Sequence, residues 1–330
     1  MKKLAVILSI TAIVSLVGFA ISMAVYGTNN TELLAPCSIY FSDGETVINE
    51  DYEDGKTYSM EYGKDISSLE IDIASANFNI VCSDTDKTVV KYTAYDHTSF
   101  SSVYENGRLT MKQGKTVNIG FDLGGKSSLI EVALPAKTYD EAVFSMMSGN
   151  GNVKGLAVKK FTSSSMSGDC DYDVSAENIT IDSMSGDLKL TDSTQGRARS
   201  VKLSGMSGNR SINLLADEWD ISSASGDVSI TGLGGKVTAD TASGNLTLDY
   251  TEWGGDLHIE CSSGNMRVYL PAGSAAELDF DTMSGDLIVY ENGSHEKYTD
   301  DEQLHIGTGS SVHNADINTA SGDLTIEIRQ

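Results

Sequence analysis

The sequence predicts an all-β fold, a single-stranded parallel β-solenoid of about eleven coils with 18–22 residues each. Three observations predict it: a turn motif that occurs nine times, alternating apolar residues on both sides of each turn, and the size of one repeat, which is too small to fold alone. We expect the repeats to occupy residues 65–330, after one N-terminal transmembrane or signal helix.

The repeated turn consists of Ser, Gly and then Asp or Asn, as in Ser243-Gly244-Asn245. Successive glycines are separated by 19, 18, 22, 18, 18, 20, 21 and 37 residues, a period typical of repeat architectures. Glycine adopts positive φ without a Cβ clash, and Ser and Asx side chains can bond backbone groups two residues further on. The predicted structural turn glycines are Gly149, Gly168, Gly186, Gly208, Gly226, Gly244, Gly264, Gly285 and Gly322.

Apolar residues alternate with polar residues around this turn. The fifth residue before the glycine is apolar in eight of the nine copies, and the fourth residue after it is apolar or aromatic in all nine. A period of two on both sides of a turn predicts two short strands per repeat, each with one face directed inward.

The conformational entropy that one repeat loses on folding costs more free energy than burial of its own side chains returns. Ordering about 18 residues costs roughly 18 to 36 kcal/mol, whereas about five buried apolar side chains return only about 8 to 15 kcal/mol. The remainder must come from neighbouring repeats, so we expect them to stack as successive coils. Crossovers between parallel strands of one sheet are overwhelmingly right-handed, which favours a right-handed solenoid.

The chain has 330 residues and a formal net charge of −24. An acidic surface of this kind repels nucleic acid and anionic lipid, and it keeps exposed sheets soluble. We therefore expect no nucleic-acid partner.

Residues 1–26 contain two lysines followed by an uncharged, mainly apolar run that is long enough to span a bilayer. This run predicts a membrane anchor, with the acidic bulk of the chain outside the cell by the positive-inside bias. Ser22-Met23-Ala24 could instead serve as a signal-peptide cleavage site, which would give a secreted protein. Residues 27–64 are acidic and lack a sustained period, so we interpret them as a juxtamembrane spacer.

Two stretches interrupt the regular repeat. Residues 89–95 and 108–112 are predicted as antiparallel strands joined across Asn106-Gly107. Residues 291–303 form a polar excursion before the last repeat, and the chain stops at Gln330 directly after a strand. The open edge expected there must be covered by the excursion, be guarded by Glu327 and Arg329, or meet a partner, so self-association through the C-terminal edge is one prediction.

Two patterns suggest ligand chemistry. Asp169, Asp171 and Asp173 alternate along one strand and point to one outer face, which makes them a weak candidate for calcium, although the glycine and distal glutamate of an EF-hand loop are missing. Residues 120–127 match the phosphate-loop string, but a strand pattern follows instead of the required helix, so a β-turn is favoured. The Asx column is interpreted as a structural turn ladder, and no cofactor is expected.

Catalytic residues do not stand out. His258 and Arg267 point outward and Trp253 lies at a turn, so these three could line a glycan-binding groove. No nucleophile, base and orienting group stand at a recognisable spacing. We therefore expect no enzyme, with a polysaccharide-active β-helix enzyme as the alternative.

The Ser-Gly-Asx column, the strand ends Val132-Ala-Leu-Pro135 and Val268-Tyr-Leu-Pro271, and the single apolar N-terminus resemble a bacterial family of unknown function with β-strand repeats, the putative-adhesin family. The resemblance implies a membrane-tethered solenoid on the cell surface, linked in some members to envelope-stress operons, and it supplies no catalytic residues. We accordingly expect adhesin-like binding or scaffolding in the bacterial envelope, with an unknown envelope protein or glycan as partner.

Overall fold

A computed structural model describes residues 45–48, 55–63, 65–95, 99–114, 127–291, 293–299 and 301–329. All elements in these ranges are β-strands, and none of these residues forms a helix that could cross a membrane. The predicted anchor and most of the phosphate-loop string lie outside the described residues, as does most of the predicted spacer.

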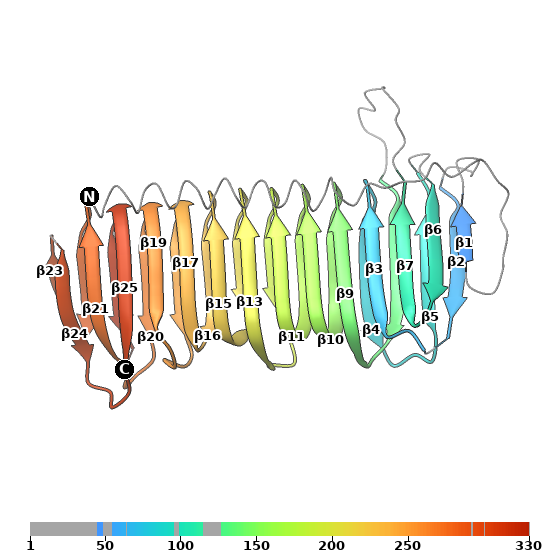
Figure 1. The fold of residues 1–330 in the computed structure, drawn as a ribbon. Coiled ribbons are helices and arrows are strands. Elements are labelled where there is room, and N and C mark those ends of the chain that lie inside the picture. The colour runs from blue at the N-terminus through green and yellow to red at the C-terminus, as the bar shows by residue number, and fades with distance from the viewer. Residues whose placement is uncertain are drawn as a thin grey trace, which may run out of the picture. The chain divides into compact units, whose positions relative to one another are not determined.

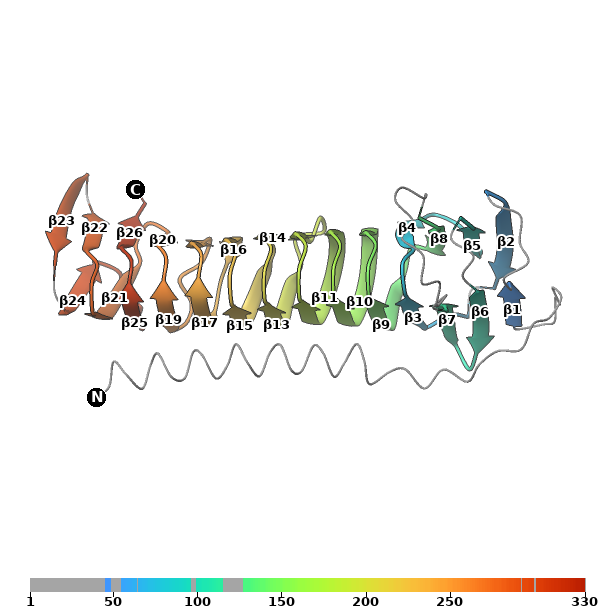
Figure 2. The same ribbon diagram turned by 90° about the horizontal axis from the view of Figure 1, so that it is seen from above.

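The chain divides into two compact units, a first unit that ends at Ala176 and a second that begins at Glu177. Each unit contains two sheets whose strands lie side by side, and Figures 1 and 2 show the strands in two rows. The predicted all-β, solenoid-like class is therefore confirmed for the described part of the chain.

The first unit begins in the stretch that was predicted as a spacer, because residues 45–48 and 57–62 are strands paired with later ones. One sheet has the spatial order β1 (Glu45–Ile48), β6 (Phe100–Glu105), β7 (Arg108–Gln113), β3 (Ser68–Ile73), β9 (Thr138–Met146) and the second half of β10 (Gly151–Ser165). The other sheet has the order β2 (Thr57–Tyr62), β5 (Thr88–Thr93), β8 (Leu129–Pro135), β4 (Asn77–Ser83) and the first half of β10.

The Asn106-Gly107 turn is confirmed, since both residues have positive φ, 50° and 81°. The strand that it joins to β7 is β6, however, and not the predicted residues 89–95. Those residues contain β5, which pairs antiparallel with β2 and β8 in the other sheet.

The second unit begins within β11 (Cys170–Ser183), and its coils continue in chain order through β20. One sheet holds β13 (Arg197–Gly205), β15 (Leu215–Ser223), β17 (Lys236–Ser243) and β19 (Leu257–Ser263) as parallel neighbours. The other holds β12 (Leu188–Thr191), β14 (Arg210–Asn213), β16 (Val228–Leu233), β18 (Leu246–Tyr250) and β20 (Met266–Leu270), also parallel.

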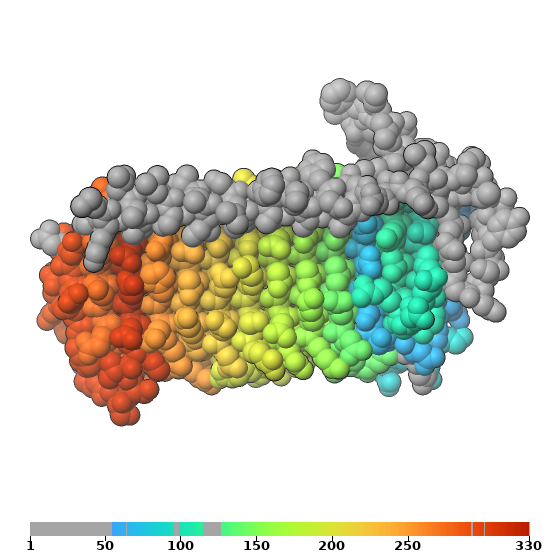
Figure 3. Space-filling model, viewed as in Figure 1, coloured from blue at the N-terminus to red at the C-terminus, as the bar shows by residue number. Residues whose placement is uncertain are grey.

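The order then departs from the chain. β25 (Val312–Ser321) lies between β19 and β21 (Ala275–Thr282), and β26 (Leu324–Ile328) lies between β20 and β22 (Leu287–Glu291). In Figure 3 the darkest red residues accordingly form a band between lighter ones. We call residues 312–328 the last coil, and residues 68–83, which are likewise inserted between β7/β8 and β9/β10, the early coil.

This insertion corrects the predicted C-terminal edge. β26 is paired on both sides, so the end of the chain is not an open edge. The polar excursion instead contributes β23 (Ser294–Tyr298), and β24 (Glu302–Gly307) follows it. These strands pair antiparallel with β22 and β21. The excursion therefore covers the coil of β21 and β22, and that coil in turn covers β25 and β26.

The core follows the predicted alternation. The residues five before and four after each turn glycine are buried in every repeat. Ser163, the one polar residue at the first of these positions, lies 3.1 Å from the Tyr172 hydroxyl, and both side chains are buried. Rings of Phe78, Phe144, Phe161 and Tyr172 pack with centroids 5.3 to 6.4 Å apart.

The turn glycines stack on one another within each unit. Gly244 has φ of 107°, and a Cβ there would overlap the carbonyl oxygen of Gly226 in the preceding coil. Glycine is therefore required twice over, by the backbone conformation and by the close approach of the next coil. The same overlap with a carbonyl of the neighbouring coil recurs at seven other turn glycines: Gly149, Gly168, Gly208, Gly226, Gly264, Gly285 and Gly322.

Side chains of the turn bond the neighbouring coil rather than their own, which corrects the expected local Asx and Ser bonds. The backbone N–H of Asn245 donates to Asp227 Oδ1 at 2.8 Å, and Ser243 Oγ donates to the Ala224 carbonyl at 3.2 Å. Parallel coils in register lie about 4.8 Å apart, which places these groups within reach of each other. The Asx column is thus a structural ladder, as predicted.

Candidate binding surface

The outward face of the second unit's first sheet carries carboxylates on adjacent strands. In-register pairs place Asp240 beside Glu260, and Asp316 beside Asp279. His258 Nδ1 lies 3.1 Å from Asp316 Oδ2, and its Nε2 lies 3.6 Å from Glu260 Oε1. We call these five residues the acidic face.

Asp240 is the most perturbed carboxyl of this face. Its pKa is raised to about 6, mainly by burial and next by the nearby Glu260 carboxylate, while His258 acts in the opposite direction. Its carboxyl group is therefore about half protonated, and so about half uncharged, near pH 6.

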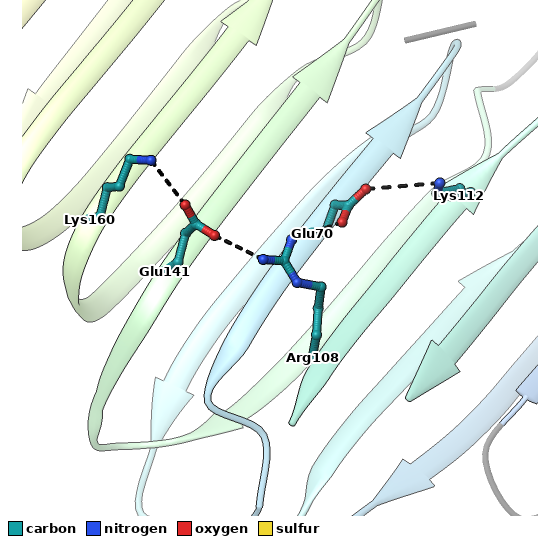
Figure 4. A network of polar contacts seen from close by, with 5 residues as sticks. All are labelled: Glu70, Arg108, Lys112, Glu141 and Lys160. Atoms are coloured by element: carbon teal, nitrogen blue, oxygen red, sulfur yellow. Dashed lines mark hydrogen bonds and ion pairs between the residues drawn. The ribbon is translucent and has the colours of Figure 1, made fainter. Parts of the chain in front are cut away.

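The first unit has a different surface at its early coil. Arg108 on β7 donates to Glu70 on β3 at 3.0 Å and to Glu141 on β9 at 2.9 Å. Lys160 on β10 donates to Glu141 at 3.1 Å, and Lys112 lies 3.9 Å from Glu70. Figure 4 shows these alternating charges as one ladder that crosses four neighbouring strands. Positive and negative groups thus compensate each other over the early coil.

The predicted calcium residues do not converge. Asp169, Asp171 and Asp173 alternate with buried Cys170 and Tyr172, so the outward direction of the three carboxylates is confirmed. Among the residues with described placement, no group of three or more His, Cys, Asp or Glu side chains could hold a metal ion. Asp173 instead accepts a hydrogen bond from the Gly155 N–H at 3.2 Å.

The three residues predicted to line a groove, His258, Arg267 and Trp253, lie apart from one another. His258 lies on β19 and Arg267 on β20, which belong to different sheets because the Gly264 turn stands between them. Trp253 Nε1 donates to the Ala275 carbonyl at 2.8 Å, and its ring packs against Tyr250 and His313. The Trp253 indole therefore holds the start of β21 in place through this hydrogen bond. His258, Arg267 and Trp253 do not line one common groove.

The cysteines that the structure describes, Cys82, Cys170 and Cys261, are free thiols. Cys170 is 7 % exposed, and burial raises the pKa of its thiol to about 11. It occupies an inward position of its strand, as its alternation predicts.

One family model, described as Toastrack DUF4097, matches residues 66–327, a stretch that includes all nine stacked Ser-Gly-Asx turns. The chain belongs to the Toastrack family. This membership confirms the family resemblance drawn from the turn motif.

Solved structures similar to this Toastrack chain include two putative adhesins. One, from Parabacteroides distasonis, is 16% identical with a TM-score of 0.43, and the match covers 82% of this chain and 98% of that one. Another, from Bacteroides fragilis, is 13% identical with a TM-score of 0.40, covering 82% and 97% of the two chains. A search of curated proteins finds no match.

Proposed function

We propose that this Toastrack protein is a non-enzymatic, adhesin-like component of the bacterial cell surface that binds or scaffolds other envelope components. The observation that carries the proposal is the acidic face, where carboxylates of neighbouring coils line up in register on an outward sheet surface. Such a surface complements cationic groups, so the proposed partner is a basic envelope protein or a glycan that carries amines. Two related structures are described as putative adhesins, which agrees with this proposal.

The proposal includes an anchor formed by the apolar run within residues 1–26, which leaves the repeat domain outside the cell, and a role under envelope stress. A solenoid of about eleven right-handed coils also belongs to this proposal.

Surface labelling of intact cells tests the location. Lys159 and Lys160 are 58% and 60% exposed, so an amine reagent that does not cross membranes should label the protein before lysis. Fractionation should leave the protein with membranes. Labelling that requires lysis would contradict the proposed location.

Binding to isolated cell envelopes tests the face. The double variant Asp279→Asn/Asp316→Asn should weaken salt-sensitive binding of the full chain, because rows of like charge contribute mainly through long-range attraction. The matched control is Asp84→Asn/Asp140→Asn, which removes the same charge from the first unit. Equal binding by both variants would contradict a role for the acidic face.

A further inference from the structure

The last coil of the second unit lies between two coils that are consecutive in the sequence. We call this position the slot. β25 contacts β19 on one side and β21 on the other, while β26 contacts β20 and β22. The described coils from β13 to β18 are each followed in space by the next coil of the chain. The last coil alone enters between two coils that were made before it in the sequence.

The slot preserves the register of the repeat. Ile317 pairs with Ile259 on one side and with Phe280 on the other, and Leu324 pairs with both Met266 and Leu287. Without the last coil, Ile259 could therefore pair directly with Phe280 in the register used by the rest of the unit. The two flanking coils can accept an inserted coil or close on each other without changing which residues face inward.

A short link, residues 308–311, leads into the last coil. Ala275, at the start of β21, pairs with Gly307 on one side and with Val312 on the other. Residues 308–311 must therefore pass around the start of β21. A short connection of this kind is a hinge from which an identical element can be exchanged between copies.

The contacts that retain the last coil are ones that any copy of the chain could supply. Ala315, Ile317, Leu324 and Ile326 are buried between the sheets. Arg329 donates to both carboxylate oxygens of Asp249, at 2.7 and 2.9 Å, and its guanidinium lies 4.8 Å from the centre of the Tyr269 ring. Asp323 Oδ1 accepts from the Asp286 N–H at 3.0 Å, which continues the Asx ladder through the slot.

We propose that this slot also accepts the last coil of a second copy of the chain, so that two copies exchange residues 312–328 whenever the link cannot return the coil to its own slot. The partner is the chain itself, because only a segment with the repeat's own inward pattern, glycine corner and Asx residue fits both neighbours in register. The exchange leaves each slot filled, and it differs from end-to-end pairing of open edges because no free strand edge is used.

Hinge variants of the full chain test the exchange. Deletion of residues 308–310 leaves one linking residue, which spans about 7 Å, less than the two strand spacings of about 9.6 Å that the link must cross. The last coil then cannot reach its own slot. We expect the deletion variant to change from monomer to dimer in light scattering, whereas a matched three-residue insertion after Gly309 should remain monomeric. A deletion variant that stays monomeric, or that folds in neither form, overturns the proposal.

A complementation measurement gives a second test that does not depend on the deletion. The full chain is cut at a protease site introduced after Gly309, partly unfolded and refolded with a tenfold excess of a fluorescent peptide of residues 311–330. We expect most refolded chains to carry the labelled peptide, and a peptide with Gly322→Val to be incorporated at least about tenfold less, because its side chain would overlap the Gly264 carbonyl. Equal incorporation of the two peptides, or none of either, overturns the proposal.

Discussion

The two units each place one coil out of chain order, but they secure it in different ways. The early coil is followed by β5 after a short turn and preceded closely by β2, so the chain holds it on both sides. The last coil is preceded by the short link of residues 308–311, which passes around the start of β21. The inserted coil thus follows a strand of the opposite sheet in one unit, and a link that crosses two strand spacings in the other.

The charges around the two inserted coils also differ between the units. Glu70 of the early coil lies within the ion-pair ladder of Figure 4, where Arg108 bridges it to Glu141. Asp316 of the last coil has His258 on one side and the like charge of Asp279 on the other. The comparison teaches that a coil in matching register can be inserted out of chain order both where charges compensate each other and where like charges adjoin.

The largest expected effect comes from filling the glycine corners of the two coils. Gly149→Val should destabilise the first unit by about 3 kcal/mol or more, because the side chain would overlap the Ala76 carbonyl of the early coil. Gly322→Val should release the last coil alone. Hydrogen exchange should therefore show lost protection across the first unit for Gly149→Val, and mainly in β25, β26 and their neighbours for Gly322→Val.

The matched control is Gly63→Val, where a Cβ meets open space and which should change stability by less than about 0.5 kcal/mol. Loss of protection throughout the second unit in Gly322→Val would contradict the expectation that this variant releases the last coil alone.

A smaller, pH-dependent effect distinguishes the acidic face. Burial raises the pKa of Asp240 from 3.8 to about 6, so the folded state binds a proton more tightly than the unfolded state. This carboxyl therefore costs stability above pH 6, and that cost disappears as the pH falls toward 4. Asp240→Asn should stabilise the protein by about 1 to 2 kcal/mol at pH 7 and by little at pH 4.

Chemical denaturation at both pH values measures this difference. Glu141→Gln in the charge-compensated ladder serves as the comparison and should show the opposite sign, because Lys160 and then Arg108 lower the pKa of that carboxyl despite its partial burial. An Asp240→Asn effect that is the same at pH 4 and pH 7 would exclude the proposed cause.

The smallest effects should come from the two bridging arginines. Arg108 and Arg329 are 42% and 46% exposed, so each alanine variant should cost at most about 1 kcal/mol. Arg329→Ala should raise the exchange rate of β25 and β26 amides selectively, and Arg329→Lys should restore only part of the protection, since lysine cannot bind both Asp249 oxygens in the same way. An equal increase in amide exchange rate over the whole second unit would contradict a local role for the Arg329–Asp249 contact.

Much of the fold could be predicted from the sequence, because the information is local. The Ser-Gly-Asx turn and the alternation around it specify two strands, an inward face and a stacked corner at every repeat. The order of the coils could not be predicted, since each coil presents the same pattern to either neighbour. The 37-residue step to Gly322 was the available signal, because it left enough chain for the excursion to fold back as cap strands.

The surface was less predictable for the same reason. His258 was recognised as outward-facing, but its partner Asp316 is 58 residues away and becomes a neighbour only through the inserted coil. The perturbed carboxyl of Asp240 and the ladder around Arg108 likewise depend on which strands adjoin. The sequence groups Arg267 with His258 because both positions are expected to point outward, but the Gly264 turn places the two on different sheets.

Disulfide trapping tests the out-of-order last coil most directly, in a background where Cys37, Cys82, Cys170 and Cys261 are replaced by alanine. Asn318 is in register with Glu260 on one side and with Asp281 on the other. The structure therefore predicts rapid oxidation of Glu260→Cys/Asn318→Cys and none of Glu260→Cys/Asp281→Cys, whose strands lie about 9.6 Å apart. Rapid oxidation of the second pair and not the first would show coils stacked in chain order and would contradict the account.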